Sequence, residues 1–285
     1  MDNRKLRVDP TAFLSRADFG AHHQETIDHV NNRIFRAYRG HTGTAPSDIF
    51  RLRHQVYCVE CAFLQPDHSI DGMEFDDYDH ASTHFAAYTM EEKLVGAVRL
   101  VQPGNSRPYP FELHCQVFNE VELPDRSQAA EVSRLVVKKS HRRRRADSVL
   151  GVPGFGRPLG HGPEIDIDAS IDRRDNTSPM LLLGMYREMY RHSQECGVRY
   201  WYAAMERSLA HALGKMGFGF TPIGPKAEYY GAVTPYILDL HELGRKLSSS
   251  NPELAAWFNE KDPVVKRHHP SRLHIVRKHA FKDIN

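Results

Sequence analysis

One stretch in the middle of the chain restricts the possible folds more than any other. Residues 131–137 read Glu-Val-Ser-Arg-Leu-Val-Val, a Val-rich apolar run that carries one carboxylate and one guanidinium. An apolar run of this length that is ended by charged residues is typical of a buried strand. Burying Glu131 and Arg134 costs free energy unless each charge finds a partner. We therefore expect this strand to hold the chemistry of the protein.

A basic segment follows that strand at once. Residues 138–145 read Lys-Lys-Ser-His-Arg-Arg-Arg-Arg, whereas the formal net charge of the whole chain is only +2. Such a segment forms a solvated face, binds nucleic acid or docks an acidic partner. Nucleic acid is disfavoured because no aromatic residues are interleaved with the cations and no known binding motif is present.

Composition indicates a soluble globular protein. The 285 residues are 40% hydrophobic and 26% charged, which is enough apolar material for a large core. No window is apolar for long enough to cross a bilayer, and the first residues lack the apolar stretch of a signal peptide. We therefore expect a cytoplasmic protein without a transmembrane segment, for which peripheral membrane contact stays open.

Apolar periodicity predicts several elements before the central strand. Residues 24–38 have the spacing of a helix, and residues 49–57 have that of a second helix. Residues 83–90 and 94–101 are expected to form a hairpin. A short helix is expected around 113–118.

The segment after the central strand begins with a long insertion at 146–178, which is rich in Gly, Pro and Asp and has little core material. We expect it to be mobile. Strands and helices then alternate. The expected elements are a helix at 180–196, a strand at 198–205, a helix at 206–216, strands at 218–223 and 236–240, and a helical patch at 252–258.

Strands that alternate with helices, with a hairpin in front, indicate an α+β fold in the form of an α/β/α sandwich with a mixed sheet. We expect an N-terminal arm and helix at 1–44 and a main domain at 45–245. A helical and basic tail would follow at 246–285.

No metal site is expected. The acidic segment 71–80 lacks the glycine and the terminal Glu of a calcium loop. Cys58-x-x-Cys61 has no second pair that would complete a zinc site, so we interpret these residues as two buried thiols. The acids are expected to form an ion network with arginines from elsewhere in the chain: Glu74, Asp76 and Asp79 with Arg53, Arg99 and Arg134.

The order of these residues resembles a known signature. Arg53-x-x-Val56-Tyr57, Phe63, Glu74-x-Asp76-x-x-Asp79, Gly96-x-Val98-Arg99-Leu100 and Glu131-x-Ser133-Arg134 resemble the acyl-homoserine lactone synthases. The second half is more similar to N-acyl amino acid synthases and to the acyltransferases associated with the PEP-CTERM/exosortase system. Met205-Glu206-Arg207-Ser208-Leu209, Ile223-Gly224 and Glu228-Tyr229-Tyr230-Gly231 carry that similarity, and the whole resemblance covers roughly residues 45–245.

The resemblance implies the GNAT N-acyltransferase fold, whose central sheet is splayed. It implies transfer of a long-chain acyl group from the phosphopantetheine thioester of acyl-carrier protein to the amine of an amino acid or a related small molecule. The strand at 131–137 would separate from that at 198–205, and the pantetheine arm would lie in the gap. No tightly bound cofactor is implied.

One departure bears on the donor. Acetyl-CoA enzymes of this fold carry a glycine-rich loop after the central strand that holds pyrophosphate. In this chain the matching residues 141–146 have arginine at the key glycine. This favours acyl-carrier protein, whose arm ends in one phosphodiester, over acyl-CoA. The basic segment would then dock the acidic carrier protein.

The resemblance also suggests roles for single residues. Glu131 is the candidate base, with a structural ion pair to Arg134 as the alternative. Arg99 and Arg134 are grouped with it as catalytic candidates, although a network with the acids is the simpler interpretation of both. Backbone N–H groups of the strand would stabilise the oxyanion. The residues assigned to donor binding are Arg53, Tyr57, Phe63, Leu135, Val136, Val137, Arg142, Arg143 and Arg144.

Two other functions stay open. One is a homoserine lactone signal synthase that uses S-adenosylmethionine, against which the divergent second half counts. The other is a non-catalytic module of the same fold that binds a lipid or a partner protein.

Overall fold

The computed structural model describes most of the chain between residues 24 and 260. The proposed insertion at 146–178 lies outside the described residues, as do Arg143, Arg144 and the basic end of the chain. The described segments are residues 24–28, 32–39, 45–64, 69–105, 107–142 and 179–260.

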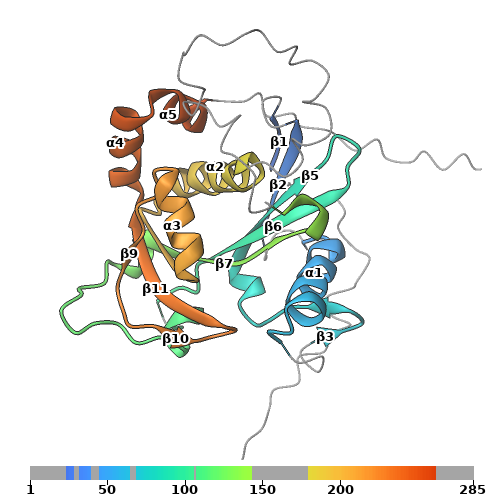
Figure 1. Ribbon diagram of the computed structural model, residues 1–285, viewed down its shortest axis with the longest axis horizontal. Coiled ribbons are helices and arrows are strands. Elements are labelled where there is room, and N and C mark those ends of the chain that lie inside the picture. Colours follow the sequence, from blue (N-terminus) through green and yellow to red (C-terminus); the bar gives the residue numbers. More distant parts are fainter. Residues whose placement is uncertain are drawn as a thin grey trace, which may run out of the picture.

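The described strands form one sheet of nine strands and a separate pair, β3 and β4. The order across the sheet is β1-β2-β5-β6-β7-β8-β11-β10, with β9 also paired to β11 (Figure 1). Strands β7 and β8 are parallel and the other neighbours are antiparallel, so the sheet is mixed as predicted. The strands are β1 (Gln24–Asp28), β2 (Arg33–Arg39), β3 (Ser69–Ile70), β4 (Met73–Glu74), β5 (Ser82–Tyr88), β6 (Leu94–Val101), β7 (Ala129–Val137), β8 (Tyr200–Met205), β9 (Thr221–Pro222), β10 (Ala227–Glu228) and β11 (Ala232–Asp239).

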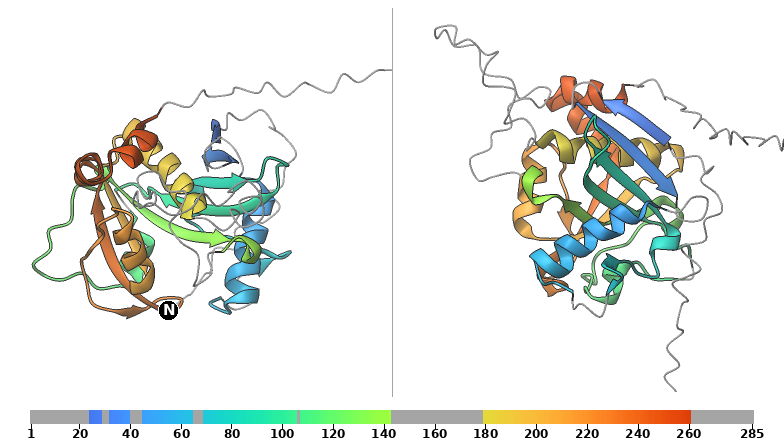
Figure 2. Two further views of the ribbon diagram at one scale, coloured as in Figure 1. Left: turned by 45° about the horizontal axis from the view of Figure 1, so that its top comes forward. Right: turned by 90° about the vertical axis from the view of Figure 1, so that its right-hand side faces the viewer.

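Helices cover both faces of the sheet (Figure 2). Helix α1 (Ser47–His54) continues into the π-helix η2 (Gln55–Glu60) and packs on one face. The opposite face is covered by α2 (Pro179–Glu195), α3 (Arg207–Lys215), α4 (Leu240–Ser250) and α5 (Pro252–Asn259). Four short 3₁₀ turns complete the described helical elements: η4 (Asp79–Ala81), η5 (Pro110–Leu113), η6 (Arg126–Gln128) and η7 (Lys139–His141).

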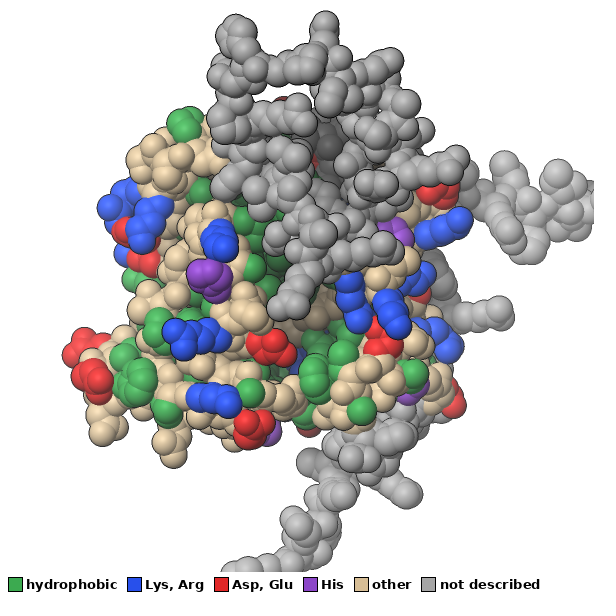
Figure 3. Space-filling view, in the orientation of Figure 1, with side chains coloured by type: hydrophobic (Ala, Val, Ile, Leu, Met, Phe, Trp, Pro, Cys, Tyr) green, Lys and Arg blue, Asp and Glu red, His purple; other side chains and the backbone are tan. Residues whose placement is uncertain are grey.

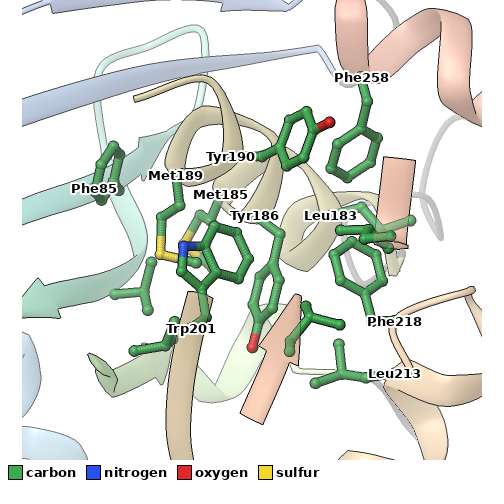
Figure 4. Close-up of a cluster of buried hydrophobic side chains, with 14 of the residues drawn as sticks. Phe85, Leu183, Met185, Tyr186, Met189, Tyr190, Trp201, Leu213, Phe218 and Phe258 are labelled. Carbon is green, nitrogen blue, oxygen red and sulfur yellow. The ribbon is translucent and has the colours of Figure 1, made fainter. Parts of the chain in front are cut away.

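The larger hydrophobic core lies between the sheet and α2 (Figure 4). Trp201 of β8 is fully buried there, and its indole N–H donates a hydrogen bond of 2.9 Å to the hydroxyl of Ser193. Phe258 of α5 packs against Tyr190 and Phe218 with ring centroids 5.8 and 5.7 Å apart. The last two helices therefore share one core with α2.

Two separate segments cover the other face of the sheet. Ile49 and Leu52 of α1 pack over the half of the sheet that holds β2 and β6. The segment between β6 and β7 covers the other half, where Phe111 contacts Tyr202 with ring centroids 4.9 Å apart. The line between these two covers runs along β7, which brings that strand to the boundary where a site can form.

The sheet parts between β7 and β8. These strands pair only from Ala129 to Glu131, which lie opposite Tyr200 to Tyr202. Beyond that point β7 stays paired with β6 through Val137, while β8 stays paired with β11 through Met205. The predicted splayed sheet is confirmed.

The helix predicted at 24–38 is wrong, because the chain forms the hairpin of β1 and β2 there. Strand β2 lies inside the sheet and is buried on both faces: Phe35 points into the core beneath α2, and Ile34 points into the core beneath α1. Adjacent apolar residues that serve two cores do not alternate with polar ones, so their spacing resembled that of a helix.

Two further predictions were wrong, and one helix was missed. The helix expected around 113–118 is the 3₁₀ turn η5, which starts earlier, at Pro110. The strand expected at 218–223 is regular only in β9. Helix α4 was not predicted at all. Its side chains Leu240, Leu243 and Leu247 complete the core beneath α2.

Candidate active site

Glu131 lies where the two strands separate. It is the last residue of β7 that pairs with β8, and only 1% of it is exposed. Its carboxylate accepts a hydrogen bond of 2.9 Å from the backbone N–H of Phe111. Burial raises the pKa of the Glu131 carboxyl to about 8, although that hydrogen bond and the guanidinium groups of Arg99 and Arg134 oppose the shift. A carboxyl group with such a pKa can exchange a proton near neutral pH.

Arg134 does not pair with Glu131, so the alternative of a structural ion pair between them is wrong. Its guanidinium instead donates to Glu74 at 3.1 Å and to Asp76 at 3.0 Å. Burial opposes the charge of Arg134, but these two carboxylates outweigh it and raise the pKa of the guanidinium. Glu131 is therefore left without an ion-pair partner among the described residues.

A β-bulge directs Arg134 toward the acids. Arg99 of β6 lies opposite Ser133 and Ala97 lies opposite Val136, so β7 has one more residue than β6 between these pairs. Arg134 has a φ of 52°, in the left-handed region. In a regular strand the side chains of Ser133 and Arg134 would point to opposite faces. With the bulge both reach the same network, since Ser133 accepts a 3.1 Å hydrogen bond from Arg99.

The structure brings three arginines and three acids together beneath α1. Arg53 donates to Glu74 at 2.5 Å and to Asp79 at 2.6 Å, which makes it a buried member of the network instead of a surface residue. Arg99 donates to Asp79 at 2.8 Å and, at 2.5 Å, to Asp76.

The charges of this network balance, and each member stabilises the others. Burial alone would raise the pKa of Asp76, but Arg99 and Arg134 outweigh it and hold this pKa at about 2. The same competition lowers the pKa values of Asp79 and Glu74. Asp76 is the most exposed of the three acids, with 27% of its side chain accessible.

The edge of β7 beyond Glu131 presents backbone groups to the gap. The N–H of Lys138 donates to the carbonyl of Val95 on β6, at 2.8 Å. Because backbone groups alternate along a strand, the N–H and C=O of Leu135 and Val137 then point away from β6. The backbone groups of Val136 point toward β6, so Val136 cannot offer its N–H to a ligand in the gap.

Two side chains donate hydrogen bonds to these carbonyls. The hydroxyl of Tyr57 donates to the carbonyl of Leu135 at 3.1 Å. The Nε–H of Arg142 donates to the carbonyl of Val137 at 2.7 Å. Arg142 also forms an ion pair with Glu60 at 2.6 Å.

Aromatic side chains surround Arg134 on the outer side of the gap. The guanidinium lies over the rings of Tyr57 and Tyr230, 5.6 and 5.4 Å from their centroids. We call this group the aromatic rim. Its members are Tyr57, Phe63, His114, Tyr229 and Tyr230.

The rest of the aromatic rim comes from distant segments. His114 stacks on Tyr229 with ring centroids 4.1 Å apart and planes at 12°. Phe63 lies against Gly231, at 3.7 Å from the position where a β-carbon would stand. Tyr230 and Gly231, with φ values of 53° and 110°, turn the chain so that the tip between β10 and β11 reaches the rim.

Sequence reasoning missed His114, Tyr229 and Tyr230 as site residues. His114 follows η5, and the two tyrosines lie more than 110 residues later in the chain. The available signal was the glycine directly after a pair of tyrosines, which indicates a tight turn with both rings near its tip.

The basic segment begins beside the gap. Lys138 directly follows β7, and η7 comes next with Lys139 and His141. Figure 3 shows Lys and Arg side chains on both sides of this face, and one group of them lies over the part that Figure 1 gives to α1.

Within the described part of the chain, no cluster of three His, Cys, Asp or Glu side chains is arranged to hold a metal ion. Cys58 and Cys61 are free and half-buried. The described helices are all too short or too polar to cross a membrane.

Comparisons with known proteins agree with this geometry. Residues 52–152 match the model of the acetyltransferase (GNAT) domain. The fold is similar to that of TofI, solved in a ternary complex with an inhibitor and MTA, with 15% identity and a TM-score of 0.50 over 75% of this chain and 94% of that one. No curated protein matches the sequence.

Two further solved structures are similar at lower scores. BjaI, a CoA-dependent acyl-homoserine lactone synthase with SAM and isopentyl-CoA, is 18% identical with a TM-score of 0.48 over 84% of this chain and 99% of its own. FeeM, an N-acyl amino acid synthase from uncultured soil microbes, is 14% identical with a TM-score of 0.46 over 75% of this chain and 93% of its own. The domain match, the splayed sheet and the likeness to TofI together show that this chain has the GNAT fold.

Proposed function

We propose that this protein is an N-acyltransferase that moves a long-chain acyl group from the phosphopantetheine thioester of acyl-carrier protein to the amine of an amino acid or a related small molecule. The observation that carries the proposal is the position of Glu131. A buried carboxyl group with a raised pKa stands at the point where β7 leaves β8, next to a free strand edge.

The free edge suits a pantetheine arm. An extended chain with amide groups can add to an exposed strand edge by pairing with its backbone. The N–H groups of Leu135 and Val137 offer that pairing, and their C=O groups, which Tyr57 and Arg142 hold, would join it once released. The acyl chain would continue toward the apolar core beneath α2, where Met185 and Met189 are flexible enough to adjust to it.

The chemistry needs one base and one oxyanion site. Glu131 takes a proton from the neutral amine of the acceptor as the amine nitrogen attacks the thioester carbonyl carbon. The carbonyl oxygen becomes an oxyanion, which an N–H group on the free edge stabilises. Collapse of this intermediate breaks the C–S bond. The proton on Glu131 then returns to the departing thiolate, so the carboxylate is regenerated.

The buried ion network helps to position the strand that carries Glu131. Arg99 and Arg134 fix the bulge of β7 through Ser133 and Asp76, and their positive charge limits how far burial raises the pKa of Glu131. In this role they are positioning residues, and the acceptor approaches past the aromatic rim.

The donor assignment follows from the basic segment. Lys138 and Lys139 are placed beside the gap, and carrier proteins are acidic, so charge attraction would speed their encounter. Acyl-CoA is the competing donor. A comparison of the two donors at equal concentration distinguishes them.

The experiment that tests the function is product analysis by mass spectrometry. The purified chain is incubated with long-chain acyl-carrier protein and a panel of amines that includes the amino acids and S-adenosylmethionine. We expect an N-acyl amino acid from the wild type and far less of it from Glu131→Gln in the same time. Absence of any acylated product with every amine and both donors would overturn the proposal.

A further inference from the structure

The contacts of Tyr57, Glu60 and Arg142 at the gap have a consequence for donor binding. We propose that these three residues form a clasp over the free edge of β7, and that the phosphate of the donor arm opens it by competing with Glu60 for Arg142. We call this group the gap clasp. The inference rests on the proposed function, since it assumes that a pantetheine arm binds in the gap.

The gap clasp occupies the backbone groups that an incoming strand would use. The hydroxyl of Tyr57 and the Nε–H of Arg142 hold the carbonyls of Leu135 and Val137. These carbonyls belong to alternate residues and point to the same side, about 7 Å apart along the strand. An arm that pairs with this edge must therefore displace the donors that now hold it.

The clasp joins two elements that lie beside the gap. Tyr57 and Glu60 lie on η2, whereas Arg142 follows η7 at the end of β7. The ion pair between Glu60 and Arg142, at 2.6 Å, connects the two elements. The side chains of Arg142 and Glu60 are 34% and 18% exposed, whereas the Nη2 atom of Arg142 that faces Glu60 is buried, so a ligand reaches the guanidinium through its other nitrogen atoms.

A phosphate group is the chemical class that can open this contact. A guanidinium has five N–H donors in a planar fork and binds phosphate oxygens in pairs. A phosphate therefore offers Arg142 a stronger partner than the neutral carbonyl of Val137. Glu60 competes for the same guanidinium and keeps it on the clasp until a phosphate arrives.

The clasp therefore selects the donor by its phosphate. A pantetheine thioester without phosphate cannot compete for Arg142 and must break the clasp unaided. Phosphopantetheine on a carrier protein and the same group within CoA both carry the required chemistry. The test therefore compares free phosphopantetheine, the group that the carrier protein holds, with CoA.

Calorimetric titration of the full chain measures the effect without turnover. The ligands are phosphopantetheine, CoA and pantetheine. The variants are Glu60→Gln and Arg142→Gln, with Arg142→Lys as the variant that keeps the charge. Glu242→Gln is the matched control, because Glu242 forms an ion pair with Arg245 on the surface of α4.

We expect Glu60→Gln to bind phosphopantetheine about fivefold more tightly than the wild type. This factor corresponds to roughly 1 kcal/mol, the free energy of a partly exposed ion pair that the phosphate no longer has to break. Its affinity for pantetheine should rise less, because pantetheine offers Arg142 no phosphate. Arg142→Gln should lose the preference for the phosphorylated ligand, and Arg142→Lys should retain part of it. A larger gain for CoA than for phosphopantetheine would identify CoA as the source of the phosphate.

Two results overturn the inference in different ways. If the wild type binds phosphopantetheine but Glu60→Gln behaves like Glu242→Gln, the gap clasp is wrong and the proposed function is unaffected. If the wild type binds neither phosphopantetheine nor CoA, the proposed function fails and the clasp fails with it. Thermal unfolding of each variant shows that the comparison is made on folded protein.

Discussion

The carboxylate of Glu131 accepts a hydrogen bond from the backbone of Phe111, whereas the guanidinium of Arg134, three residues later on the same strand, is held by Glu74 and Asp76. The two charged residues of β7 thus have separate partners. Glu131 is consequently a buried acid whose pKa is raised by its surroundings, and this property leads to the first two predictions.

Replacing Glu131 by Gln should lower kcat about 100- to 10,000-fold, because the amine loses its proton acceptor. In the wild type, kcat/KM should rise with pH and level off above a pKa of about 8, where the carboxyl group is ionised. The residual activity of the variant should lack this dependence. Steady-state rates between pH 6 and 9 check it, and a variant profile identical to that of the wild type would assign the base elsewhere.

The same group makes folding depend on pH. Its pKa is about 8 in the folded chain and about 4.5 when unfolded, so the folded state binds the extra proton in between. The stability that this proton contributes is complete below pH 4.5 and is lost as pH rises through 8. Relative to Glu131→Gln, the wild type should lose about 2 kcal/mol of unfolding free energy between pH 6 and pH 8. Urea unfolding of both proteins measures this, and parallel curves would contradict it.

Breaking the ion network should destabilise the fold. Arg53→Ala removes one of the two arginine partners of each of the buried carboxylates Glu74 and Asp79 and should cost about 3–5 kcal/mol of unfolding free energy. Arg51→Ala, on the exposed side of the same helix, is the matched control and should cost less than about 0.5 kcal/mol. Equal losses for the two variants in chemical denaturation would show that the network contributes little.

The aromatic rim should control the acceptor and not the donor. Tyr230→Ala removes a partly exposed ring beside Arg134 and should raise the KM for the amine about tenfold. A tenfold change corresponds to a loss of roughly 1.4 kcal/mol of binding free energy. The KM for the acyl donor should stay the same. Met90→Ala changes a similarly exposed apolar residue at the turn between β5 and β6 and should alter neither constant. An equal rise in both KM values for Tyr230→Ala would assign the ring to the donor.

Charge reversal at Lys138 and Lys139 should raise the KM for acyl-carrier protein about tenfold, because attraction of the acidic partner is replaced by repulsion. The KM for a free acyl-pantetheine should not change. Lys93→Glu, on the turn between β5 and β6, is the control. If added salt weakens the wild type and the reversed variant equally, the basic segment has no docking role.

The sequence correctly predicted those elements in which a single physical cause, such as burial or a glycine at a helix end, determines the residue pattern. The Val-rich run after Glu131 is a strand because it is buried, and Gly197 and Gly217 follow the ends of two helices as expected. The hairpin at 24–39 was missed because β2 serves two cores at once, which removes the alternation of an ordinary strand.

The site was less predictable because it depends on contacts between distant segments. The bulge places a non-glycine residue, Arg134, at positive φ, which no local propensity indicates. The stack of His114 on Tyr229 requires two loops to meet across the sheet. In contrast, the partners of Glu74, Asp76 and Asp79 were expected, since buried acids require cations and the chain offers few arginines next to apolar runs.

Strands β7 and β8 share three residue pairs, and α2 packs against the strands on both sides of that junction. The opening angle between the two half-sheets is therefore determined by the side-chain volumes of one helix. Met185, which touches the position of a missing β-carbon at Gly96, is one such spacer. Replacing Met185 by a smaller or larger residue should change the width of the gap between the half-sheets. The width of the acyl group that fits would change with it, although no group that takes part in the reaction is altered.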